Sequence, residues 1–238
     1  MSGRRLLVVG AHSADFVWRA AGAIARNTAA GGESVVVALS YGERGESGEL
    51  WKQEGQTEEN VKRLRHAEAE QACRVVGARL EAFDLGDYPL LVTAPAIDRL
   101  AELIRDFAPH VVLTHPDRDP FNPDHPAAHA AVAQARLLTS GAGVASGFRT
   151  VPPTEFLVFE PHQPEQCDFK PNRILNITEV WETKWKAFQE LPAQRHLWDY
   201  YERVALNRGM QGGRNSGRAM TYGEAYQTIF PDAVEVLA

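Results

Sequence analysis

The fold is decided by residues 6–15, whose sequence is Leu-Leu-Val-Val-Gly-Ala-His-Ser-Ala-Asp. Four apolar residues in a row are typical of a strand that is buried on both faces of a parallel sheet. The alanine-rich segment 16–30 follows and stops at Gly31 and Gly32, which predicts a helix that ends at a glycine. A strand that leads straight into a helix is the building unit of α/β proteins.

The same alternation continues along the chain. We predict further strands over 34–39, 79–84, 111–114, 155–159 and 174–177, and further helices over 56–76, 96–107, 126–138, 180–190 and 197–208. Alternating strands and helices predict an α/β fold, with a mostly parallel sheet and helices on both faces. The pattern loosens after Ser140, so we expect a C-terminal elaboration within a single domain that spans residues 1–238.

Composition excludes several classes of protein. The 238 residues carry a net charge of −6 and 44% of them are hydrophobic, which fits neither a disordered nor a fibrous protein. The acidic balance argues against a nucleic-acid partner, and no apolar run approaches the roughly 20 residues that cross a membrane. Two cysteines, Cys73 and Cys167, are too few for a disulfide framework. We therefore expect a cytoplasmic enzyme that acts on a small molecule.

Histidines and acids gather after several of the predicted strands. Ligands of open α/β sheets bind beyond the carboxyl ends of the strands, so these residues are expected at one edge of the sheet. They are His12 and Asp15 after the first strand, Glu43, Arg44 and Glu46 after the second, His115, Asp117, Arg118, Asp119, Asn122, Asp124, His125 and His129 after the fourth, and Glu160 and His162 after strand 155–159. One loop histidine is usually solvated, but this many at one edge indicate a functional site.

His12 and Asp15 lie three residues apart at a strand-to-helix turn, where both side chains can reach a common point. A histidine, a carboxylate and a second histidine form the ligand set of a catalytic zinc site, with one position open for water or substrate. His125 or His129 supplies the third ligand, and spacing alone does not choose between them. The competing interpretation is that Asp15 only caps the helix that follows it.

The loop from Tyr41 to Gly48 contains three glycines, two carboxylates and one guanidinium. It lacks the spacing of a P-loop, and its acids would repel a phosphate. A substrate loop that carries an acid/base glutamate fits better, although a solvated charged turn is the commoner fate of such a segment.

These motifs resemble those of the PIG-L/LmbE-like zinc deacetylases. Residues 12–15 resemble the family's A-H-P-D-D-E motif, 39–45 its L-T-x-G-E-x-G segment, 122–125 its H-P-D-H motif and 222–226 its Y-A-E-A-F segment. The resemblance implies a Rossmann-like fold with zinc held by His12, Asp15 and His125, although the same ligands accept iron(II) or cobalt(II). The resemblance also implies that His129 lies either behind the metal ligands or facing the substrate.

Two positions depart from the family pattern. Ala14 stands where the deacetylases carry the aspartate that activates the zinc water, and Asn122 stands where they carry a histidine that assists the oxyanion. The sequences of residues 11–20 and 41–47 are similar to those of one branch of the superfamily, the 4-oxalomesaconate (4-carboxy-2-hydroxymuconate) hydratases, which hydrate carbon–carbon double bonds. The resemblance implies a hydro-lyase of gallate and protocatechuate breakdown that forms 4-carboxy-4-hydroxy-2-oxoadipate.

Hydration needs a base that positions the metal-activated water and an acid that protonates carbon. We expect Glu46 to be the base, with Glu43 as the alternative. His162 is the expected acid, unless it is only a surface residue. The tricarboxylate substrate also needs polar and cationic partners. Its expected partners are Arg44, Arg118, Asn122 and His129, with Arg208, Arg214 and Arg218 as further candidates.

Two other functions stay open. A zinc-dependent N-acyl (amino-sugar type) deacetylase would need another residue in place of the base missing at Ala14. A metal-bearing binding protein without activity would need neither Glu46 nor His162, and their retention argues weakly against it. Trp181, Trp185 and Phe188 share one face of a predicted helix, either in the core or at a subunit contact. Because family members are often oligomeric, we expect a homo-oligomer.

Overall fold

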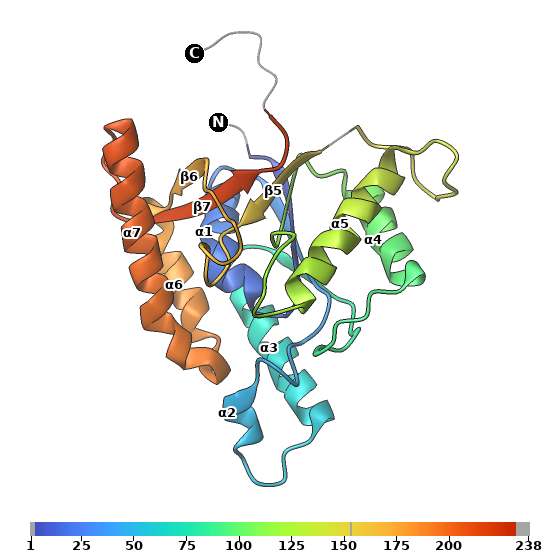
Figure 1. Cartoon of the computed structure of the whole chain (residues 1–238), viewed down its shortest axis with the longest axis horizontal. Helices are drawn as coiled ribbons and strands as arrows, with labels where there is room; N and C mark the ends of the chain where they lie inside the picture. Colours follow the sequence, from blue (N-terminus) through green and yellow to red (C-terminus); the bar gives the residue numbers. More distant parts are fainter. Residues whose placement is uncertain (1–2, 153, 232–238) are drawn as a thin grey trace.

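The computed structural model describes residues 3–152 and 154–231 (Figure 1). In this part of the chain seven strands form one sheet in the order β3-β2-β1-β4-β5-β7-β6. The strands are β1 (Arg5–Gly10), β2 (Glu33–Ala38), β3 (Arg79–Ala82), β4 (Val111–Thr114), β5 (Glu155–Phe159), β6 (Arg173–Asn176) and β7 (Gly223–Thr228). β1 to β5 pair in parallel, whereas β7 is antiparallel to both β5 and β6. The prediction of an α/β fold with a mostly parallel sheet is therefore confirmed.

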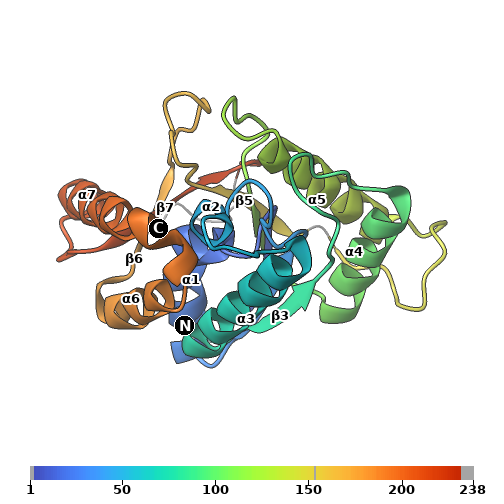
Figure 2. The same ribbon diagram turned by 90° about the horizontal axis from the view of Figure 1, so that it is seen from below.

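Helices cover both faces of this sheet (Figures 1 and 2). The helices are α1 (Asp15–Ala29), α2 (Gly48–Trp51), α3 (Glu58–Val76), α4 (Ala94–Phe107), α5 (Asp124–Ser140), α6 (Trp181–Gln189) and α7 (Trp198–Ser216), with short 3-10 turns at Thr178–Val180 and Pro192–Leu197. Successive residues of β1 enter two separate cores. Val8 packs with α1, α3 and α6, and Val9 packs with α4 and α5. None of the helices in the described residues is long and apolar enough to cross a membrane.

The C-terminal part holds the main differences from the predicted elements. β7 was not predicted, because Gly-Glu-Ala-Tyr-Gln-Thr lacks apolar alternation and becomes a strand through pairing on both of its sides. α7 continues past the predicted end at 208, through Gly209, and reaches Ser216. Gly209, within the helix, allows close packing, since a Cβ there would lie 2.0 Å from the Thr221 carbonyl oxygen. Phe188 lies in the core, with its ring 4.9 Å from that of Trp18.

A buried polar cluster joins α1 to α6 and β7. The Glu224 carboxylate accepts hydrogen bonds from the backbone N–H groups of Gly22 and Ala23, both at 2.8 Å, and pairs with Lys184 at 2.6 Å. Lys184 also donates to the carbonyl of Trp18 at 2.9 Å. In an α-helix that carbonyl faces the N–H of Gly22, so the ion pair contacts both groups of one helical position of α1. The cluster therefore fixes the first turns of α1, which carry site residues.

Candidate metal centre

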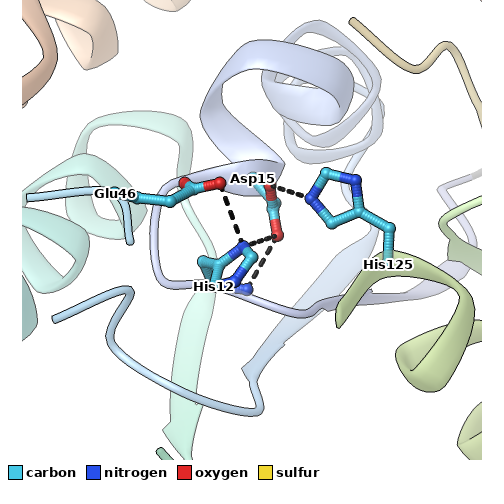
Figure 3. Close-up of side chains that lie close together, drawn as sticks. All are labelled: His12, Asp15, Glu46 and His125. Carbon is cyan, nitrogen blue, oxygen red and sulfur yellow. Dashed lines mark hydrogen bonds and ion pairs between the residues drawn. The ribbon is translucent and has the colours of Figure 1, made fainter. Parts of the chain in front are cut away.

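Four side chains from three separate segments meet beyond the carboxyl ends of β1, β2 and β4 (Figure 3). His12 and Asp15 come from the turn between β1 and α1, Glu46 from the loop after β2, and His125 from the first turn of α5. One ligand atom of each residue lies within 4.8 Å of the ligand atoms of the others. These four residues therefore meet at the edge of the sheet where the sequence pattern predicted them.

The geometry of the cluster fits a metal ion. His12 Nδ1 lies 3.5 Å from Asp15 Oδ2 and 3.2 Å from Glu46 Oε1, and His125 Nε2 lies 3.9 Å from Asp15 Oδ1. Ligand bonds of about 2.0–2.1 Å in a tetrahedron separate neighbouring ligand atoms by about 3.3 Å. His12 Nδ1 and His125 Nε2 are both buried without a hydrogen-bond partner in the described residues. Unpartnered buried nitrogens that face a carboxylate are the donor set of a divalent-metal site.

Two aspartates hold the histidine rings from behind. Asp124 Oδ2 lies 3.1 Å from His12 Nε2 and Asp119 Oδ2 lies 2.7 Å from His125 Nδ1. Such carboxylates fix the ring orientation and the tautomer of a metal-binding histidine. The sequence pattern placed both Asp124 and Asp119 at this edge of the sheet, but it assigned no role to Asp119. A carboxylate six residues before a candidate ligand, on the same loop, was the available signal.

The charges around the cluster favour a cation. Burial opposes protonation of His12, yet Glu46, Asp124 and Asp15 raise its pKa well above the ordinary value. Burial would raise the pKa of Asp15, but His115 and Arg19 hold it well below its usual range. Burial lowers the pKa of His125 to about 4, so its ring is neutral at pH 7 and free to bind a metal.

Glu46 is held in place by two amides. Its Oε1 accepts from Asn122 Nδ2 at 3.3 Å and its Oε2 accepts from Gln194 Nε2 at 3.2 Å. Gln194 is itself fixed by the buried Arg65, which donates to its Oε1 at 3.0 Å. Glu43 points elsewhere, since it is fully buried, accepts from the backbone N–H of Tyr41 and lies 3.5 Å from Lys62. Of the two glutamates, Glu46 is thus the one beside the cluster.

A cavity of about 540 Å³ opens onto the centre. The expected site residues on its lining are Glu46, Asn122, His125 and His162. Its lining also includes Arg19, Lys52, Tyr88, Gln194 and His196, which sequence reasoning did not select. The His162 ring stacks on Tyr200, with the ring centroids 4.1 Å apart. Burial and the charge of Arg19 lower the pKa of this histidine below its usual value.

Several residues expected at the substrate lie outside this lining. Arg44 pairs with Glu58 at 3.3 Å and Arg118 pairs with Asp168, both on the surface. His129 Nδ1 bonds to the backbone oxygen of His115 at 2.8 Å. Arg208 is occupied by a bidentate pair with Glu160, and Arg214 and Arg218 are also absent from the cavity lining. Sequence order cannot separate a loop arginine that turns outward from one that turns inward.

Known proteins resemble the chain in sequence and in structure. Residues 7–136 match the family model described as PIG-L, GlcNAc-PI de-N-acetylase. Over 236 residues the chain is 47% identical to the 4-oxalmesaconate hydratase of Pseudomonas putida KT2440, which covers 98% of this chain and 92% of that protein. The crystal structure of GalB, the 4-carboxy-2-hydroxymuconate hydratase of Pseudomonas putida KT2440, is 46% identical and superposes with a TM-score of 0.96 over 99% of this chain and 100% of that one.

A deacetylase shares the same architecture at lower identity. The N,N'-diacetylchitobiose deacetylase of Pyrococcus horikoshii superposes with a TM-score of 0.79, over 95% of this chain and 84% of that one. The two chains are 19% identical, so this likeness shows a common fold.

Proposed function

The chain belongs to the PIG-L family, as its motifs predicted, and we propose that within this family it is a metal-dependent hydratase of 4-oxalomesaconate (4-carboxy-2-hydroxymuconate). The observation that carries the proposal is the near full-length similarity to named hydratases, at 46–47% identity. Ala14 agrees with it, because a fully buried methyl group stands where a deacetylase has its base. The reaction adds OH to one alkene carbon and H to the other, with no redox partner.

Zinc is the proposed metal, with His12, Asp15 and His125 as its ligands. The buried unpartnered nitrogens of the two histidines and the carboxylate between them support this assignment. A zinc ion held there would supply a water whose pKa falls from about 15.7 to about 7. Iron(II) or cobalt(II) would fit the same donor set.

Glu46 is the proposed base. Its carboxylate approaches His12 to 3.2 Å and lines the cavity, so it can hold the attacking water by one of its oxygens and take a proton from it. Asn122 and Gln194 each donate to a different oxygen of this carboxylate and fix its plane. In this position Asn122 orients the Glu46 carboxylate and does not assist an oxyanion.

His162 is the proposed acid that protonates the second alkene carbon. It lines the same cavity and comes from the segment after β5, whereas Glu46 comes from the loop after β2. Its Nδ1 lies 3.4 Å from the hydroxyl of Tyr201, so Nε2 is the nitrogen left to carry the proton to the substrate. Carboxylates of a bound substrate would raise its lowered pKa towards neutrality.

The test is an ultraviolet assay of metal-analysed protein with 4-carboxy-2-hydroxymuconate. We expect loss of the conjugated chromophore, abolition of the activity by a chelator and its return on addition of zinc. A fully metallated protein that leaves the chromophore intact would contradict the proposal. Release of amine from N-acetyl amino sugars, measured in parallel, would favour the deacetylase alternative instead. A single domain, a homo-oligomeric assembly and a cytoplasmic location stay predictions.

A further inference from the structure

The cavity contains one buried cation that the expected site did not include. Arg19 lies one helical turn after Asp15 in α1, is 7% exposed and lines the cavity beside Glu46 and His162. The other strongly basic group on this lining is Lys52, which is exposed and pairs with Glu49 at 2.5 Å. Arg19 is therefore the guanidinium placed within reach of a bound ligand.

Most hydrogen-bond donors of Arg19 are free. Its Nη1 donates to Asp15 Oδ1 at 2.7 Å. Its Nε is buried without a partner, and its Nη2 makes no hydrogen bond to any residue within 3–152 and 154–231. A buried donor that is left unpaired destabilises the folded protein, because it has lost its hydrogen bonds to water. Free donors on a buried guanidinium therefore call for an acceptor that is not part of the chain.

Two aromatic rings flank the guanidinium. Its central carbon lies 5.8 Å from the centroid of the Phe159 ring and 6.0 Å from that of Tyr201. Nε and Nη2 form one edge of the fork, opposite the Nη1 that is bonded to Asp15. That free edge has the spacing of the two oxygens of a carboxylate.

The charge of the cavity makes such a contact necessary. Glu46, Glu49 and Asp119 all line it, and each would repel a polyanionic ligand. Building on the hydratase function proposed above, we propose that the free donors of Arg19 bind a carboxylate of the substrate and so select polycarboxylates over neutral N-acyl sugars. Arg19 takes the part that sequence reasoning gave to Arg44 and Arg118.

The experiment measures binding by calorimetry to zinc-loaded protein, separately from turnover. Propane-1,2,3-tricarboxylate is a saturated probe that cannot be hydrated, and acetohydroxamate is a zinc ligand without a carboxylate. For Arg19→Gln we expect about 10- to 100-fold weaker binding of the tricarboxylate and a change of less than about twofold for acetohydroxamate. Arg26→Gln is the matched control, because Arg26 lies on the same helix, pairs with Glu179 and is outside the cavity.

Unchanged tricarboxylate binding in Arg19→Gln would overturn the proposal. Equal losses for both probes would also overturn it, because Arg19 would then act only through Asp15. If Arg19→Gln does not fold, Arg19→Lys decides, since lysine keeps the charge but lacks the fork. A larger loss for the tricarboxylate than for acetohydroxamate then supports the proposal, and wild-type affinity for both contradicts it.

The same measurements separate this inference from the proposed function. The wild-type protein could bind the tricarboxylate through Arg19 and yet fail to hydrate 4-carboxy-2-hydroxymuconate. That result would support the carboxylate site and contradict the hydratase function. If the wild type hydrates the substrate and Arg19→Gln has the same KM, the hydratase function is supported and the carboxylate site is contradicted.

Discussion

Replacement of Asp119 by asparagine tests how much the centre depends on the groups behind its ligands. The Asp119 carboxylate lies 2.7 Å from His125 Nδ1, and both side chains are only 4% exposed. Its other oxygen accepts from the backbone N–H groups of Phe121 and Asn122 at 3.0 and 3.3 Å. Asparagine keeps the volume and one carbonyl oxygen, so the loop contacts can survive while an amide N–H faces the ring N–H of His125.

The expected cost follows from that single contact. Loss of a carboxylate that orients a metal-binding histidine weakens metal affinity by about 10- to 100-fold, which equals about 1.4–2.8 kcal/mol. We expect the upper half of this range, because the bond is short and shielded from solvent. The dissociation constant for zinc can be measured at pH 7 by competition with a chromophoric chelator.

Asp117→Asn supplies the control for this experiment. Asp117 lies on the same loop but is exposed, so its variant should bind zinc as the wild type does. If Asp119→Asn keeps the wild-type far-ultraviolet spectrum and binds zinc within about twofold of the wild type, the argument that Asp119 tunes His125 is refuted.

Three further predictions concern the reaction and the fold. Ala14→Asp should impair hydration, because it buries a carboxylate beside the metal ligands, and it should not create amide cleavage. The chromophore and amine-release assays check both expectations. Amide cleavage with undiminished hydration would contradict the prediction. If protonated His162 is the acid, kcat/KM should fall as pH rises through its pKa, which burial lowers from the ordinary value of a histidine. The corresponding fall in kcat should come at higher pH, because the carboxylates of a bound substrate favour the imidazolium form of His162. If the pH profile of His162→Gln still shows this fall at high pH, His162 is not the acid. Glu224→Gln leaves the Lys184 ammonium buried without its carboxylate, so urea unfolding should show a loss of about 3–5 kcal/mol; a loss below about 1 kcal/mol would show that the pair adds little.

The N-terminal half of the fold could be predicted because its signals are local. The apolar strands are buried on both faces, and each is followed by polar residues at the edge where the site forms. His12, Asp15, Glu46 and His125 converge there for that reason. β7 had no such signal, since its strand character depends on neighbours far away in the sequence.

Side-chain direction limited what could be predicted of the site. Arg44 and Arg118 follow the correct strands but turn to Glu58 and Asp168 on the surface. Arg19 lies within a helix, and only its spacing of four residues from Asp15 linked it to the centre. Helical spacing places two residues on one face, but the packing of α1 against Tyr201 decides that this face looks into the cavity.

The contact between Glu224 and α1 has a consequence for how the molecule is made. The hydrogen bonds to Gly22 and Ala23 join residues that are 202 and 201 positions apart in the chain. On the ribosome, β1 to β5 can pair as they emerge, but α1 gains the contacts of Glu224 only after β7 has followed them out. A nascent chain that has not yet reached Glu224 therefore displays the proposed metal ligands on a helix that lacks this support.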